Sequence, residues 1–360
     1  MSRTTDTARA VHDLIRHCHG GLDVPGLHAQ MLRSVRRLMP VDAAFFATAD
    51  PETLLFTGAY ADEPLNAATP LFLDNEFGGA DVNRFTSLAI SADHVASLDT
   101  ATHSDRWSSG RYREIMRPLG LGDELRAALV VGSQCWGYLC LHREDHPLGF
   151  TDSEAALIAS IGPHLAHGLR QAVLLHGSPA SGGSGEPGVV LLAEDLSIVA
   201  VTPEAAHLLS LVEERRSLEL PLPLAVYTVA MALRAIEQGT APSRTLPTSR
   251  IRTIDGQWLT VYASRLQGPP SEQRISVVIK TAETAATIPL LLSAHGLSPR
   301  EAEVARLVLR GTSTQLISDT LHISPHTVQD HLKAVFDKVG VRSRRDLIGQ
   351  LLHPPGSDGG

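Results

Sequence analysis

The sequence is poor in the features that mark membrane, secreted and disulfide-rich proteins. No stretch reaches the roughly 18 consecutive apolar residues that a membrane-spanning helix needs, and the N-terminus lacks the apolar core of a signal peptide. Only three cysteines occur in 360 residues, Cys18, Cys135 and Cys140. They form neither a disulfide framework nor a zinc cluster of the usual spacing, so we interpret them as small buried hydrophobic residues. We therefore expect a soluble, cytoplasmic protein with no membrane partner.

The sequence also lacks the motifs of several catalytic and sensory classes. It contains no glycine-lysine P-loop for ATP, no HExxH metal motif and no strand-end acidic cluster of a phospho-receiver domain. The 17 histidines form no Cys/His cluster, and His164 and His167, three apart on an expected helix, are interpreted as ordinary polar partners. We predict no catalytic residues, no metal and no fixed cofactor. A small-molecule ligand of unknown identity in the N-terminal domain remains open.

Length and charge limit how many domains the chain can form and which part of it can bind a polyanion. With 360 residues, of which 43% are apolar, it is long enough for two or three globular domains. The net charge of −8 is unfavourable for binding phosphates, but it is unevenly distributed. Residues 297–352 carry eight Lys/Arg against six Asp/Glu, whereas the rest carry 23 against 33. Only a small C-terminal surface is therefore suited to a polyanion, and its non-specific affinity should be modest.

Residues 297–352 predict four short helices. The apolar residues of the third recur at offsets of four, seven and eleven from Val328 and therefore share one face, opposite a polar one. Glycines at 311 and 340 are placed to end the first and third helices. Each helix has a capping residue at its start: Ser298, which forms a capping box with Glu301, then Ser313, Ser324 and Ser343.

Two short helices joined by a tight turn form a helix-turn-helix, whose second helix fits the major groove of DNA. The segment resembles the LuxR-type (LuxR/FixJ) DNA-binding domain along its whole length of 56 residues. The resemblance implies a non-enzymatic transcription regulator that binds double-stranded DNA as a homodimer at a near-palindromic site, with RNA polymerase as a candidate partner. The matching positions are Leu297, Ser298, Arg300, Glu301, Glu303, Val304, Gly311, Ser313, Ile317, Leu321, Ile323, Ser324, Thr327, Val328, His331, Lys338, Val341 and Arg344.

The resemblance also implies which residues contact DNA. Base contacts fall to Gln329, Asp330 and Lys333 on the third helix, and Asp330 is an acidic departure from the family pattern. The family commonly has lysine where this chain has Gln329 and Gln315, so the site sequence should differ from that of relatives. Further contacts are assigned to His326, Thr327 and His331, and to Ser313, Thr314 and Gln315, where free amides at a helix start favour a phosphate. Glu303 and Arg344 are expected to form a structural ion pair between the first and fourth helices.

Residues 7–175 predict an α+β domain. Helical periodicity over 7–39 is followed by two strand pairs, at 41–61 and 126–144, and by a long amphipathic helix after Thr151. Between the pairs, residues 62–105 are polar and are expected to be an irregular cover over a pocket. This order, with the phrases at 122–126 and 150–154, resembles a GAF domain, which implies small-molecule or signal sensing.

Further boundaries follow from composition. Residues 176–187 form a small-residue linker, and 188–282 resemble a PAS domain in element order. Residues 283–296 are a connector, 297–353 the helix-turn-helix domain and 354–360 a disordered tail. The predicted fold class is thus multidomain, with α+β sensor domains followed by an all-α DNA-binding domain.

Two functions remain open. In the first, the sensor domain modulates promoter binding, with a signal ordering residues 62–105 and shifting the helix after Thr151. The alternative is a GAF-fold redox enzyme or sensor that uses Cys135 and Cys140. These cysteines lie five apart in one strand, so we expect them to face opposite sides of the sheet, unable to pair.

Overall fold

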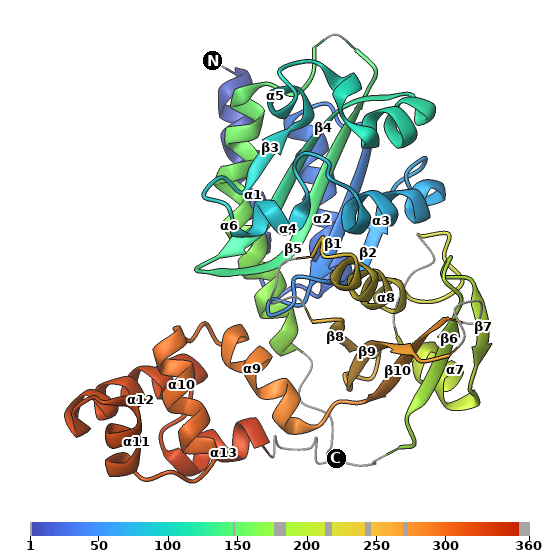
Figure 1. The fold of residues 1–360 in the computed structure, drawn as a ribbon. Coiled ribbons are helices and arrows are strands. Elements are labelled where there is room, and N and C mark those ends of the chain that lie inside the picture. The colour runs from blue at the N-terminus through green and yellow to red at the C-terminus, as the bar shows by residue number, and fades with distance from the viewer. Residues whose placement is uncertain are drawn as a thin grey trace.

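The computed structural model describes residues 2–146, 148–175, 185–212, 218–241, 246–268 and 273–352, with side chains from residue 8 onward. These residues form two antiparallel sheet domains followed by a helical domain, which confirms the predicted fold class (Figure 1). The predicted linker, apart from residues 185–187, and the predicted tail lie outside the described residues. None of the helices in the described ranges combines the length and apolar character that a membrane crossing requires.

The first sheet has five antiparallel strands in the order β2-β1-β5-β4-β3. Its two longest strands are joined by a tight turn, where Gly132 has a φ of 66° that favours glycine. The strands are β1 (Ala43–Ala49), β2 (Phe56–Ala61), β3 (Val95–Ser97), β4 (Leu121–Val131) and β5 (Gln134–Glu144).

Helices cover both faces of this sheet. α1, α2 and α6 pack on one face around a core that includes Phe46, Leu139 and Leu165. The other face is covered by residues 62–119, and its core includes Phe45 and Tyr138. The helices are α1 (Ser2–Cys18), α2 (Val24–Leu38), α3 (Thr69–Gly78), α4 (Phe85–Ile90), α5 (Leu98–Ala101) and α6 (Asp152–Leu175), with short 3-10 or π turns at Asn66–Ala68, Arg106–Ser108, Tyr112–Met116 and Arg117–Leu119.

The prediction that residues 62–105 are irregular was wrong. They form α3, α4, α5 and the edge strand β3. Phe85 and Leu88 are buried, and the Glu76 carboxylate accepts from Phe85 N at 2.7 Å and from Arg126 Nη1 at 2.8 Å. Because the contact with Arg126 spans 50 residues, it stabilises structure that the local polar composition does not indicate.

The second sheet repeats the strand order of the first, as β7-β6-β10-β9-β8, and all its neighbouring strands are antiparallel. Its order of strands and helices agrees with the prediction, and its assignment as a PAS domain stays a prediction. Its elements are β6 (Gly188–Leu192), β7 (Ile198–Val201), α7 (Pro203–Ser210), α8 (Leu224–Glu237), β8 (Thr248–Arg252), β9 (Trp258–Leu266) and β10 (Arg274–Thr281).

α8 joins the two sheet domains. Val226 and Val229 belong to the core of the second sheet, whereas Tyr227 and Met231 pack into the core beneath α3 of the first. Thr228 Oγ1 donates to the backbone oxygen of Phe56 at 3.1 Å. A helix that is apolar nearly all round is expected where it is buried between two layers.

The predicted connector is largely a helix, α9, which packs against both α6 and α10. The four helices beyond it confirm the predicted pattern. The capping box of Ser298 and Glu301 is formed, and Gly340 has a φ of 80° at the end of the third helix. The helices are α9 (Thr284–Ala294), α10 (Pro299–Leu309), α11 (Thr314–Leu321), α12 (Pro325–Val339) and α13 (Arg344–Leu352).

Candidate nucleic-acid interface and sensor interior

α12 turns a polar face to solvent. Its predicted apolar stripe is buried against α10 and α11, while Gln329, Asp330 and Lys333 are exposed. His326 is also exposed, and its Nε2 lies 3.8 Å from Asp330 Oδ2. Lys333 has no ion-pair partner within the parts of the chain that the structure describes, so its charge is available to a partner.

The first turn of α12 is locked by its own side chains. Ser324 Oγ accepts from Thr327 N at 3.0 Å and lies 2.8 Å from Thr327 Oγ1. Thr327 and His331 are only partly exposed, so they border the exposed strip. The DNA contacts predicted for these two residues are compatible with this position and stay a prediction.

The start of α11 has the predicted cap. Ser313 Oγ accepts from Leu316 N at 3.3 Å. Ser313 itself is exposed, so the N-terminus of this helix lies at the surface. Gln315 is exposed and donates to Asp319 Oδ1 at 3.0 Å. Free amides at such an N-terminus are suited to a phosphate.

Thr314 links the two helices of the motif. Its hydroxyl oxygen accepts from Gln329 Nε2 at 3.5 Å and from Arg344 Nη2 at 3.0 Å. The structure therefore brings residues predicted from α11 and α12 into one surface, and Arg344 of α13 contacts it.

The predicted ion pair between Glu303 and Arg344 is not formed. Glu303 Oε2 instead binds Arg300 Nη1 at 2.6 Å, and Arg344 Nη1 donates to the backbone oxygen of Thr312 at 3.1 Å. Arg300 lies three residues before Glu303 on the same helix, so it reaches the carboxylate without crossing between helices. Arg344 therefore links the start of α13 to the segment that begins α11, while α13 packs against α10 through its apolar residues.

Comparisons with known proteins agree with this geometry. The family model described as bacterial regulatory proteins, luxR family, matches residues 295–350, and that of the GAF domain matches residues 27–169. The spore germination protein GerE of Bacillus subtilis is 36% identical over 56 residues, which are 16% of this chain and 76% of GerE. This chain belongs to the LuxR family of bacterial regulatory proteins. Members of this family are transcription regulators and are typically not enzymes.

Other relatives match a similarly short part of this chain. Proteins of Mycobacterium bovis and Mycobacterium tuberculosis named as HTH-type transcriptional regulators are 44% identical over 54 residues, or 15% of this chain. This chain spans only 6% of their length. The crystal structure of Escherichia coli SdiA covers 95% of both chains at 10% identity, but its TM-score of 0.34 is too low to support an inference.

The GAF domain contains a buried network of charged side chains between its sheet and α3. Glu124 is fully buried, with Arg111 Nε at 2.7 Å from one carboxylate oxygen and Arg126 Nε at 3.2 Å from the other. Burial by itself would raise the pKa of Glu124, but the two guanidinium groups outweigh it and hold that pKa well below its usual range. Glu124 therefore stays ionised inside the domain.

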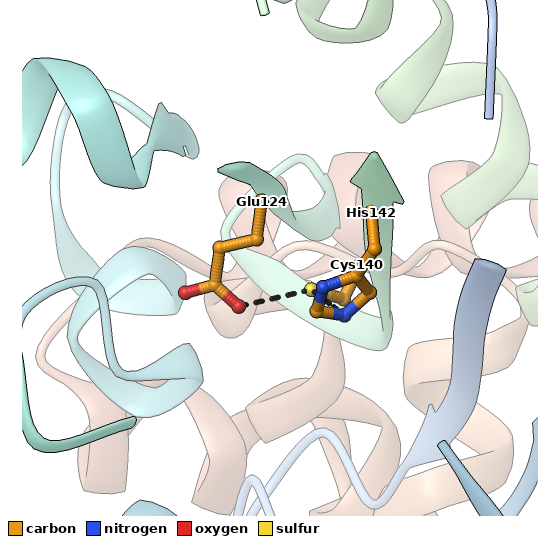
Figure 2. A group of neighbouring side chains, drawn as sticks. All are labelled: Glu124, Cys140 and His142. Atoms are coloured by element: carbon orange, nitrogen blue, oxygen red, sulfur yellow. Dashed lines mark hydrogen bonds between the residues drawn. The ribbon is translucent and has the colours of Figure 1, made fainter. Parts of the chain in front are cut away.

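Cys140 and His142 adjoin this network from the neighbouring strand (Figure 2). Cys140 Sγ lies 3.4 Å from Glu124 Oε2 and 3.1 Å from His142 Nε2, and one ligand atom of each residue lies within 4.8 Å of the others. This spacing suits a metal ion. Both oxygens of Glu124, however, already accept from arginines, and a cation would face two guanidinium charges. We interpret the group as part of the ion-pair network, and the absence of a metal stays a prediction.

The network leaves little empty space. The adjoining cavity measures about 30 Å³, room for about two water molecules. Its walls include Arg111, Arg126 and the rings of Phe45 and Phe72. Sequence reasoning missed this network. Glu124 and Arg126 lie in the phrase at 122–126 that supports the GAF resemblance, but no local pattern linked them to Arg111 or Glu76.

The three cysteines are buried, as predicted, at 1%, 2% and 1% exposure for Cys18, Cys135 and Cys140. Burial raises the pKa of Cys18 to about 12 and that of Cys135 to about 11. Because the thiolate is the reactive form, this environment disfavours redox chemistry. The alternative function in redox catalysis thus receives no support from the site.

The expected orientation of Cys135 and Cys140 was wrong. A β-bulge, where Leu129 pairs with Gly137 but Val130 pairs with Cys135, shifts the alternation between them. Both therefore lie in the same core beneath α3. Five residues of strand still separate them by roughly 16 Å, too far for a disulfide.

Burial lowers the pKa of His142 to about 4, against about 6.5 in an unfolded chain. Between these two pKa values the unfolded state binds a proton that the folded state does not bind. The contribution of His142 to the free energy of unfolding is therefore complete above pH 6.5 and is lost as the pH falls toward 4. We expect acidification from pH 7 to pH 5 to cost the wild type about 2 kcal/mol more than His142→Gln, in urea unfolding at each pH.

Comparing the wild type with His142→Gln cancels the contributions of all other titrating groups. Burial raises the pKa of Asp123 to about 6, which has the opposite effect on acidification, but both proteins share it. A difference in unfolding free energy that is equal at pH 7 and pH 5 would show that His142 does not titrate as described.

Proposed function

We propose that this LuxR-family chain binds promoter DNA through α11 and α12, and that its GAF domain modulates this binding through α9. Gln329, Asp330 and Lys333 contact bases, while His326, Thr327 and His331 flank them. Ser313, Thr314 and Gln315 hold a phosphate at the α11 N-terminus. A homodimer on a near-palindromic site, a small-molecule effector and contact with RNA polymerase belong to the same proposal.

The observation that carries this proposal is the shared position of α9. Leu290 and Ala294 belong to the apolar core of the GAF domain, whereas Leu291 and Leu292 belong to that of the LuxR domain. Cores are closely packed, so a helix that contributes to both cannot shift without disturbing each.

One hydrogen bond and one packing contact hold this connection near the C-terminal end of α9. Gln134 Nε2, at the β4–β5 turn, donates to Ser293 Oγ at 2.6 Å. The Arg170 guanidinium of α6 packs against Gly296, where an added Cβ would lie 2.9 Å from Nη1. A rearrangement of the GAF domain would therefore move α9 and, through it, α10.

Selection of bound sequences from random DNA, with the full chain, tests binding and site symmetry together. On the selected site, Lys333→Ala should weaken binding by about 10-fold or more, because a base contact contributes about 1–3 kcal/mol. The affinity is measured by fluorescence anisotropy at fixed salt, since phosphate contacts make it salt-dependent.

Arg306→Ala is the matched control. Arg306 is exposed on α10, and its removal deletes the same charge without touching α11 or α12. We expect less than about a 3-fold effect, because a distant charge is screened at physiological salt. Equal losses in the two variants would mean that binding depends on net charge and that α12 does not read the site.

A further inference from the structure

Arg344 of α13 directs two of its nitrogens at the segment that begins α11. Its Nη2 donates to Thr314 Oγ1 at 3.0 Å, and its Nη1 donates to the backbone oxygen of Thr312 at 3.1 Å. Because the guanidinium is planar and makes both contacts at once, it fixes the Thr314 side chain relative to α13. The same Thr314 oxygen lies 3.5 Å from Gln329 Nε2 on α12. One hydroxyl group thus connects α13 to a residue that is proposed to contact bases.

The two neighbours of Thr314 determine what its hydroxyl group can do. A hydroxyl oxygen has two acceptor lone pairs and one proton, whereas guanidinium and amide nitrogens only donate. Arg344 and Gln329 therefore both donate to Thr314 Oγ1, and they occupy its two lone pairs. The hydroxyl proton is left to donate elsewhere. It lies at the helix start where a phosphate is proposed to bind.

The contact with Thr314 also limits what the exposed Gln329 amide offers to a base. A glutamine amide has two N–H donors and one carbonyl acceptor. One N–H of Gln329 is directed at Thr314, which leaves one N–H and the carbonyl oxygen for DNA. This pair matches adenine, which presents the N7 acceptor and the N6 amino donor in the major groove. Guanine presents two acceptors there and requires two donors, so an anchored amide disfavours guanine.

We propose that Thr314 and Arg344 determine sequence specificity. Thr314 anchors the Gln329 amide so that it binds adenine in preference to guanine. Arg344 is a positioning residue that acts by holding Thr314 in place. This inference rests on the DNA binding proposed above, and it adds the base that Gln329 selects and the residues that impose the choice.

The base that Gln329 contacts is identified by selection of bound sequences from random DNA with the full chain. The selection is repeated with Gln329→Ala, and the position whose base preference disappears is the one that Gln329 reads. Affinities for the wild-type site, and for the same site with guanine at that position, are then measured by fluorescence anisotropy. The wild type should prefer adenine by about 10-fold or more. A preference for guanine would mean that the amide presents both donors, and it overturns the proposal.

Thr314→Val keeps the shape of the side chain and removes the anchor. We expect the preference for adenine over guanine to fall below about 3-fold, because a free amide can turn both donors toward guanine. Preferences at the other positions should persist. The preference is a ratio of two affinities of one sample, so partial unfolding of a variant does not change it. An unchanged preference in Thr314→Val overturns the anchoring role.

Arg344→Met tests the positioning role and should cause the same fall in preference. Arg345→Met is the matched control, because Arg345 is exposed beside Arg344 on α13 and its removal deletes the same charge. We expect it to leave the preference unchanged. Should Arg344→Met fail to fold, Arg344→Lys replaces it, since an ammonium keeps the charge but lacks the planar fork that makes both contacts. A preference retained in the Arg344 variant, or lost equally in Arg345→Met, overturns the positioning role.

The selection experiment distinguishes failure of this inference from failure of the proposed function. A wild type that selects no DNA sequence contradicts both. A selected site whose preferences do not change in Gln329→Ala contradicts the base contact of Gln329 and overturns the inference with it. A site at which Gln329 reads a base other than adenine overturns only the present inference and leaves the proposed function intact.

Discussion

Replacing Arg126 by methionine should lower the free energy of unfolding by about 3–5 kcal/mol. Arg126 is 1% exposed and binds both Glu124 and Glu76. Attraction to these two carboxylates raises its pKa further, against the burial that would lower it. Methionine preserves most of the volume but leaves two buried carboxylates short of a partner, and an uncompensated buried charge is the costly outcome.

The control is an arginine that also joins two carboxylates, but at the surface. Arg265 binds Glu194 and Glu237 at 2.5 Å each, with its side chain about 21% exposed. Arg265→Met should cost less than about 1 kcal/mol, because solvent solvates the released carboxylates. Urea unfolding followed by circular dichroism measures both variants. Similar losses would mean that the buried network contributes no more than a surface one.

Arg250→Met should cost about 3 kcal/mol and loosen the contact between the two sheet domains. Arg250 belongs to β8, yet its guanidinium binds Asp50 of the GAF domain, which is 2% exposed. Its Nη1 also donates to the backbone oxygen of Ala286 in α9 at 3.0 Å. One side chain thus ties both sheets and the connector, and its loss leaves Asp50 buried without its cation.

Unfolding free energy and limited proteolysis at α9 both report this loss. Cleavage within 284–294 should accelerate in Arg250→Met, since α9 loses an anchor. Arg274→Met serves as the control, because the side-chain contact of Arg274 is with the neighbouring Gln273 oxygen. Unchanged proteolysis at α9 in Arg250→Met would show that Arg250 does not anchor the connector.

The four helices of the LuxR domain could be predicted almost to the residue. Its signals are local: Ser298 and Glu301 satisfy each other's backbone donors within one turn, and Gly340 ends α12 with a positive φ. One prediction for this domain was wrong, the ion pair between Glu303 and Arg344. Two arginines could pair with Glu303, and the structure pairs it with Arg300, which lies on the same helix. A pairing carried over from a family resemblance does not consider which other side chains of this chain can reach the same carboxylate.

The sensor part was predictable in its order of elements but not in its interior. Strand alternation predicted β4 and β5, yet it could not place the bulge that brings Cys135 and Cys140 to one side. The helices over 62–105 depend on Glu76 reaching Arg126, 50 residues away, and no local pattern encodes that contact.

The sequence by itself therefore determined the family, the four helices of the LuxR domain and the alternation of strands and helices upstream, because caps, turns and periodicity act over a few residues. Only the tertiary structure decided that α9 shares two cores, that two arginines are buried in the GAF interior, and that residues of both sheet domains line one cavity with Leu290. Those features depend on which surfaces pack together and which buried charges compensate one another, and such choices are settled between residues far apart in the chain.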